Sequence, residues 1–161
     1  MNRYHRVVQD GIVLHGQRGR FREVLRDNRP IHINHPTTKR QILYRPDAIF
    51  VTKLGKKFVF EVLDDQLHDD NLIIANIIQS YISENVARIL FVVPTESDQD
   101  KVRDLALTIY SRLVDMGISK RSLKSIGVMY ILRSEAKTKE RVAALVSKML
   151  SRQPGSMRAK H

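Results

Sequence analysis

The chain has 161 residues, enough for one domain with a substantial core that needs no disulfides. Its 42% hydrophobic and 28% charged residues are typical of a soluble globular protein. The absence of cysteine excludes thiol catalysis and zinc–thiolate sites, and no apolar stretch reaches the roughly 18 residues that span a membrane. Because the N-terminal residues also lack the apolar run of a signal peptide, we expect a cytoplasmic protein without a membrane partner.

The strongest compositional signal is the charge. Lys and Arg number 28 against 17 Asp and Glu, which gives a formal net charge of +11 and a pI near 10.2. Contacts with phosphates release condensed counterions, so this excess favours a polyanionic partner. The sequence has no glycine-rich nucleotide-binding motif. We therefore expect a nucleic acid as partner, and duplex or branched DNA rather than single strands because aromatic residues for base stacking are sparse.

The first predicted elements come before residue 30. Residues 1–16 fit either a short hairpin or part of a helix broken at Gly11 and Gly16. Residues 17–27 predict a helix, because their apolar side chains share one helical face and Pro30 stops the chain from continuing as a helix. Those apolar side chains are Phe21, Val24 and Leu25.

Three strands are expected next, from the runs of β-branched and aromatic residues. The first covers either 31–35 or 39–44. The other two cover 47–53 and 57–63 and are joined by a short hairpin at Gly55. These last two strands are expected to lie beside each other in one sheet.

The second half of the chain alternates helices and strands. The expected elements are a buried helix from Asp69 or Asp70 to about Glu84, a strand at 88–94, a helix from Thr95 or Ser97 to Gly117, a strand at 125–133 and a helix at 137–150. This order predicts a three-layer α/β/α fold with a mixed central sheet, formed by a single domain over residues 1–151. Residues 152–161 are expected to form a flexible basic tail.

Two carboxylates lie on strands that are otherwise apolar. Asp47 opens one strand and shares a face with Ile49 and Val51, and Glu61 lies in the next strand. If the hairpin pairs these strands, both acids converge at one end of the sheet. Burial and mutual repulsion oppose their ionisation, and a divalent metal ion between them resolves the conflict. The alternative is that Asp47 caps the turn after Pro46 and Glu61 pairs with a basic residue at the sheet edge.

The combination of Asp47 after a proline, Glu61 in the next strand and the flanking helices resembles the PD-(D/E)XK nuclease superfamily, which includes restriction endonucleases and Holliday-junction resolvases. The resemblance extends over residues 17–94 and implies a restriction endonuclease-like fold. It implies that Asp47 and Glu61 bind Mg²⁺ or Mn²⁺. It also implies two further catalytic residues: an acid on the first helix, for which Glu23 is the candidate, and Gln79 on the helix after the glutamate.

Leu63 departs from the pattern of this superfamily. Its members have a Lys two residues after the Glu, which helps to activate the attacking water, and a leucine cannot replace that amine. A Lys relocated from the hairpin is one alternative, although its lysines, Lys53, Lys56 and Lys57, are expected far from the glutamate. Plasmid replication-relaxation proteins, which the chain also resembles in this region, have a similarly altered Lys position.

Three hypotheses follow from these observations. The first is a metal-dependent DNA endonuclease that hydrolyses phosphodiester bonds with a relocated Lys. The second is a catalytically inactive DNA-binding or accessory protein of the same fold, with a role in replication, recombination or plasmid or virus maintenance. The third is an interaction protein whose basic charge is incidental.

Several polar segments have two interpretations each. Residues 64–70 contain four aspartates and His68, which either extend a metal site or form a solvated loop with an Asp helix cap. The helix that follows has a polar stripe, which fits buried hydrogen bonds or a homodimer interface; the stripe consists of Asn76, Gln79, Ser80 and Ser83. His32 and His35 have no further metal ligands at suitable spacing, so a zinc site is not expected.

Basic residues cluster in the first third of the chain, where each cluster is either a solvated face or a contact with phosphate. With a net charge of +11, we expect phosphate contact. The predicted nucleic-acid-binding residues are Arg18, Arg20, Arg22, Arg26, Lys39, Arg40, Lys53, Lys56 and Lys57.

Overall fold

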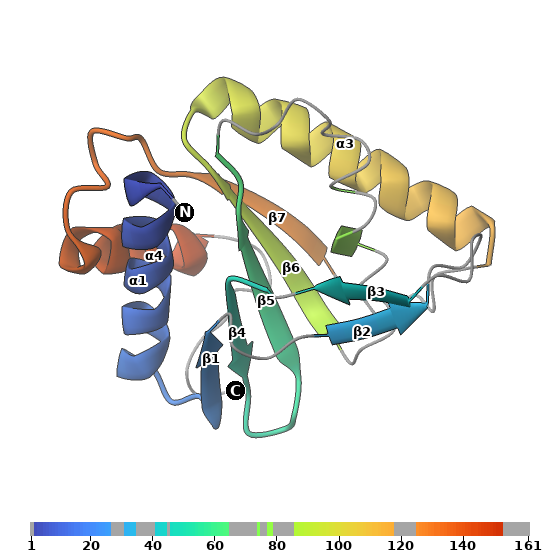
Figure 1. Cartoon of the computed structure of the whole chain (residues 1–161), viewed down its shortest axis with the longest axis horizontal. Helices are drawn as coiled ribbons and strands as arrows, with labels where there is room; N and C mark the ends of the chain where they lie inside the picture. Colours follow the sequence, from blue (N-terminus) through green and yellow to red (C-terminus); the bar gives the residue numbers. More distant parts are fainter. Residues whose placement is uncertain are drawn as a thin grey trace.

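In the computed structural model, a five-stranded mixed β-sheet has helices packed on both faces (Figure 1). The structure describes residues 2–26, 31–34, 41–44, 46–64, 74, 77–78, 86–117 and 125–152. Its helices within these ranges are α1 (Arg3–Arg18), α3 (Glu96–Asp115) and α4 (Lys139–Arg152). The large sheet contains β1 (Glu23–Arg26), β4 (Ala48–Val51), β5 (Lys57–Val62), β6 (Val86–Val93) and β7 (Ser125–Tyr130). A separate two-stranded sheet pairs β2 (Ile31–Asn34) with β3 (Gln41–Tyr44).

The large sheet has the strand order β1-β4-β5-β6-β7. Its first three strands are antiparallel neighbours, whereas β5, β6 and β7 run parallel. Gly55, at φ +82°, lies in the turn between β4 and β5, where a residue with a side chain would be strained. Parallel neighbours need a long crossover, which α3 provides between β6 and β7. The predicted α/β class with a mixed sheet is therefore confirmed.

Two apolar clusters lie on opposite faces of this sheet. One contains Val102, Ala106 and Leu113 of α3, and the other is formed with side chains of α1 and α4 such as Ile12 and Val142. Alternate residues of each strand contribute to one cluster or the other, as the pleat of a strand requires. In β6 every residue except the half-buried Ala87 is buried, as expected for a central strand covered on both faces.

Helix α1 continues without a break through both of its internal glycines, so the alternatives of a hairpin or a broken helix for residues 1–16 were wrong. The glycines are needed for close packing rather than for a turn. A Cβ atom on Gly11 would lie 2.3 Å from Val142 Cγ1 in α4, and one on Gly16 would lie 2.4 Å from Phe50 Cε1 in β4. These two positions let α1 approach both α4 and the sheet at distances that no other residue permits.

The helix predicted at 17–27 is also wrong, because α1 ends at Arg18 and residues 23–26 form β1. Val24 packs against the cluster on the α1 side, and its neighbour Leu25 packs against the cluster on the α3 side. Adjacent apolar side chains on opposite faces are the mark of a strand that is half-buried on both sides. Pairing with β4 therefore overrides the helical periodicity.

The later elements agree with the sequence. The hairpin of β4 and β5, the central strand β6, helix α3 with Thr95 as its N-cap, strand β7 and helix α4 all form where they were predicted. Of the helix expected up to Glu84, the structure describes Ile74, Ile77 and Ile78, which are helical and buried in the cluster on the α3 side. Within the described part of the chain, no helix has both the length and the apolar character needed to cross a membrane.

Gly11→Ala is expected to destabilise the protein by about 1–3 kcal/mol, even though alanine favours a helix by about 1 kcal/mol over glycine. The added methyl group would overlap Val142 and force α1 and α4 apart. Urea unfolding measures the change. Gln17→Ala, at an exposed position of the same helix, is the control and should change stability by less than about 0.5 kcal/mol. Equal or greater stability of the Gly11 variant would contradict this account of the packing.

Candidate functional site

The paired strands β4 and β5 bring two acidic residues next to each other. Ala48 is opposite Phe60 in the antiparallel register, so the next residues outward on the two strands are Asp47 and Glu61. Both are only 8% exposed. They lie at the carboxyl end of β5, the strand at which the sheet changes from antiparallel to parallel pairing. Carboxyl ends of parallel strands are common positions for functional sites in open α/β sheets.

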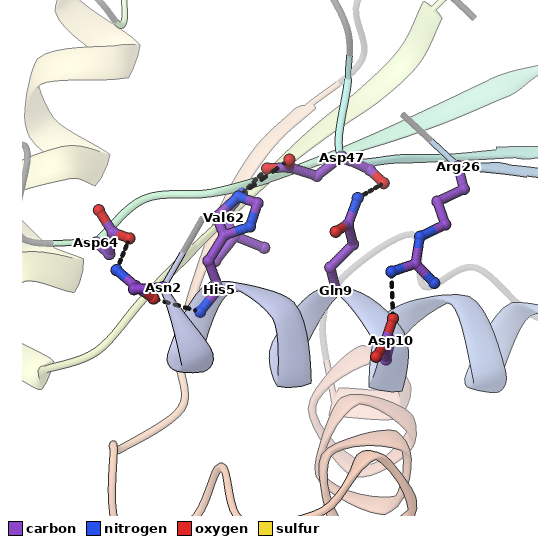
Figure 2. A network of polar contacts seen from close by, with 8 residues as sticks. All are labelled: Asn2, His5, Gln9, Asp10, Arg26, Asp47, Val62 and Asp64. Carbon is purple, nitrogen blue, oxygen red and sulfur yellow. Dashed lines mark hydrogen bonds and ion pairs between the residues drawn. The ribbon is translucent and has the colours of Figure 1, made fainter. Parts of the chain in front are cut away.

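Asp47 is held in place by α1 and by β5, as Figure 2 shows. Its Oδ2 accepts a hydrogen bond from the Val62 backbone N–H at 2.7 Å, and its Oδ1 lies 3.1 Å from Nε2 of His5. The backbone carbonyl of Asp47 accepts a hydrogen bond from Nε2 of Gln9 at 2.9 Å. His5 and Gln9 are four residues apart, so they project from the same side of α1 toward the end of β4.

His5 is the basic partner of this carboxylate. The hydrogen bond to Asp47 raises the pKa of His5 above its ordinary value of 6.5, burial opposes the rise, and the charges of Asp47 and Asp64 add to it. The other ring nitrogen, Nδ1, is buried and has no hydrogen-bond partner among the described residues. Asp47 therefore stabilises the protonated form of His5 relative to a histidine free in water.

The first turn of α1 carries further polar contacts beside this pair. Asn2 caps α1 by accepting the backbone N–H of His5, and its side-chain amide donates to Asp64, which follows β5 (Figure 2). Tyr4 donates its hydroxyl to the carbonyl of Ile131 after β7, and the guanidinium of Arg133 lies 5.0 Å from the centre of its ring. The N-terminal turn of α1 is thus fixed to the ends of both β5 and β7.

Sequence reasoning missed the roles of His5 and Gln9. Their signal was present, because both are polar residues on the side of the helix that also carries Tyr4, Val8 and Ile12. A fully buried Gln on an apolar helical face needs a specific partner. The signal could be interpreted only once residues 1–16 were known to form one helix.

The donor atoms fit a hard divalent cation in part. Two carboxylates on adjacent strands are the oxygen ligands that Mg²⁺ prefers. Asp47, however, already uses one lone pair of each oxygen with Val62 and His5, and the alternation of β5 puts Glu61 on the face of Val59 and Leu63, away from α1. Among the described residues, no group of three or more His, Cys, Asp or Glu side chains could hold a metal ion.

Leu63 belongs to the core. It is 8% exposed, packs in the cluster on the α3 side and donates its backbone N–H to the carbonyl of Val92 at 2.8 Å. The hairpin lysines do not replace an amine at this position. Lys57 begins β5 four residues before Glu61, about 13 Å away along the strand, and Lys53 and Lys56 lie in the turn beyond it.

Glu23 was predicted on the first helix, but it is an exposed residue of β1. It is opposite Val51, which lies four positions or about 13 Å along β4 from Asp47. Arg26 is at the Asp47 end of β1 and pairs with Asp10 of α1 (Figure 2).

The remaining predicted residues divide into two groups. Arg18, Arg20 and Arg22 are exposed. The backbone N–H of Arg22 donates to the carbonyl of Val51, at the end of β4 opposite Asp47. The predictions for Lys39, Arg40 and Gln79 lie outside the described residues, as do those for 65–70 and the basic tail.

Comparisons of the chain with protein-family models, with curated proteins and with solved structures find no match. The assignment of a function therefore depends on the residues themselves and on their arrangement.

The His5–Asp47 pair predicts that stability falls as the pH rises above 6.5. The folded state binds the His5 proton more tightly than the unfolded chain does, so the contribution is fully present below pH 6.5 and is lost as the pH passes the raised pKa. His5→Gln removes this dependence, so wild type should be more stable than the variant by about 1 kcal/mol at pH 6 and by progressively less at higher pH. Urea unfolding of both proteins between pH 6 and pH 9 measures the difference.

His15 provides the matched control. Burial lowers the pKa of His15, so its proton binds more tightly to the unfolded chain, and stability from this residue rises with pH in a range below 6.5. His15→Gln should therefore leave the loss above pH 6.5 intact. A constant difference between wild type and the His5 variant across the whole range would disprove the assigned coupling.

Proposed function

We propose that this chain is a DNA-binding protein on the fold of the PD-(D/E)XK nucleases, with Asp47 and Glu61 as ligands of Mg²⁺ or Mn²⁺. The register of β4 and β5, in which these two acids follow the Ala48–Phe60 pair, is the observation that supports the proposal most. After β5 the chain passes through the helical residues Ile74, Ile77 and Ile78 to the parallel strand β6, and this part of the order, the glutamate strand, a helix and a strand, is the one that the resemblance implies. The net charge of +11 supports DNA as the partner.

The chemistry of the two acids supports a cation between the strands. Their low exposure makes two negative charges costly, and a divalent cation would offset that cost. The Val62 N–H and His5 fix the orientation of the Asp47 carboxylate, and each of its oxygens keeps a second lone pair. When bound, such an ion polarises a phosphoryl oxygen and makes a bound water more acidic. His5 would act as a positioning residue, because it contacts Asp47 rather than the reacting atoms.

A non-catalytic DNA-binding protein of the same fold is the second candidate. The burial of Leu63 in the core favours it, because an apolar side chain occupies the position at which the superfamily has its lysine. In this case the two acids retain a structural role, and Asp47 joins α1 to β5 through the contacts already described.

The two candidates differ in a DNA cleavage assay. Labelled duplex, branched and single-stranded DNA are incubated with the protein in Mg²⁺, Mn²⁺ or EDTA, and binding is followed in parallel. A nuclease would be supported if the protein cleaves DNA only with metal present and if Asp47→Asn and Glu61→Gln each reduce the cleavage rate by a factor of about 100 or more. DNA binding without cleavage would favour the second candidate. Absence of DNA binding at low salt would refute both, and cleavage unchanged in both variants would place the chemistry elsewhere.

Leu63→Lys tests the site by adding the amine that the superfamily pattern has at this position, whereas the previous variants remove the acids. Position 63 has the same strand parity as Glu61, so a lysine there would supply an amine on the same face. We expect metal-dependent cleavage to increase at least tenfold, at a cost of about 2–4 kcal/mol in stability from the loss of buried Leu63. Leu63→Met is the control, since it keeps an apolar side chain and should not raise cleavage. A folded lysine variant with unchanged cleavage would count against a nuclease-type site.

A further inference from the structure

The described helices on the two faces of the sheet differ in the sign of their net charge. Residues 3–22 and 132–151, which form α1, α4 and their adjoining loops, contain ten Lys and Arg against three Asp and Glu. Helix α3, on the opposite face of the sheet, contains three Lys and Arg against five Asp and Glu. Figure 1 shows α1 and α4 side by side, with α3 on the far side of the sheet. Among the described helices, the basic excess therefore lies on α1 and α4 and not on α3.

The outward sides of α1 and α4 form a continuous surface, here named the α1–α4 surface. The exposed basic residues of the two helices include Arg3, Arg6 and Arg18 of α1 and Lys139, Arg141 and Lys148 of α4. From Arg3 to Arg18 the surface extends about 22 Å along α1, the length of roughly six base pairs of duplex DNA. Of the acids on these helices, Asp10 is paired with Arg26, and Glu140 is exposed.

A pocket of about 400 Å³ opens on this surface, between the end of α1 and the middle of α4. It is lined by His15, Arg18, Gly19, Ala143, Ala144 and Ser147. The two alanines and the glycine leave room for a group to approach the helices closely. Arg18 and Ser147 bring a cation and a hydroxyl to the lining, which are donors for phosphate oxygens.

From these observations we propose that the α1–α4 surface binds the sugar–phosphate backbone of duplex DNA, with one backbone segment in the pocket beside Arg18. This inference rests on the proposed DNA-binding function and names the surface that carries it. It also adds to the sequence prediction, because it places contacts on α4, for which none were predicted.

The surface favours DNA over an anionic membrane. Membrane-surface helices combine basic residues with exposed large apolar side chains that enter the lipid. Among the described residues, the large exposed hydrophobic side chains are Leu54, Leu107, Met116 and Leu132, and none of them belongs to α1 or α4. The face therefore offers charge and hydrogen-bond donors without an apolar anchor.

The surface also extends to the candidate site. Arg6 follows His5, whose side chain contacts Asp47, so a duplex along α1 would bring its backbone to the end of the sheet that carries Asp47 and Glu61. Contacts between the α1–α4 surface and the DNA backbone would position a substrate beside the two acids. Such contacts do not depend on the base sequence.

The test compares two triple variants that lose the same charge. Arg18→Gln, Arg141→Gln and Lys148→Gln are combined on the α1–α4 surface, and Lys101→Gln, Arg103→Gln and Arg112→Gln are combined on α3 as the control. All six positions are exposed, so both variants should fold, which circular dichroism checks. Binding to a labelled 20-base-pair duplex is measured by fluorescence anisotropy between 50 and 200 mM salt.

We expect the α1–α4 variant to bind at least tenfold more weakly than wild type at 100 mM salt. Its slope of log K against log salt should be shallower by about 2.7, since each lost phosphate contact removes about 0.9. The control variant should keep a slope close to wild type. If the two variants lose the same amount of affinity for the duplex, the assignment of DNA binding to the α1–α4 surface is overturned. The proposal that the protein binds DNA would still stand. If wild type does not bind DNA, both the proposed function and the proposed role of the α1–α4 surface are overturned. The same conclusion follows if wild type binds anionic vesicles but not duplex DNA.

Discussion

The close approach of α1 to α4 and to β4 determines where the polar features of this protein lie. It is possible because Gly11 and Gly16 present no side chain at the two contacts. Once α1 lies at this distance, its inward polar residues reach the end of β4, and its arginines point outward beside those of α4. A bulkier residue at either glycine would shift the candidate site and the basic surface together, because the same helix carries both.

The core of the fold could be predicted from the sequence where one rule of periodicity dominated. The continuous apolar run of β6 and the amphipathic patterns of α3 and α4 each allow a single interpretation. Residues 1–27 could not be predicted in this way. There glycine in α1 marks close packing rather than a break, and Val24 and Leu25 of β1 divide between the two faces of the sheet, which a helical projection places together.

The candidate site was predictable only where its geometry follows from neighbouring residues in the sequence. Asp47 and Glu61 lie at the same end of the sheet because one hairpin joins their strands, and a local rule is sufficient for that. The contacts of His5 and Gln9 with Asp47 join residues about forty positions apart, and no local rule predicts them. Glu23 was misplaced because its assignment depended on a helix that does not form, whereas Leu63, which departs from the lysine of the pattern, is buried in the core.

The uneven charge of the two faces also has a kinetic consequence. With cations in excess on α1 and α4 and acids in excess on α3, these described helices contribute an electric dipole across the sheet. In the field of a polyanion such a dipole experiences a torque before any contact is made. A larger fraction of the collisions then occurs in the orientation that leads to binding. The range of this orientation is the Debye length, about 8 Å at physiological salt. The encounter rate would therefore respond to ionic strength even where the final contacts are unchanged.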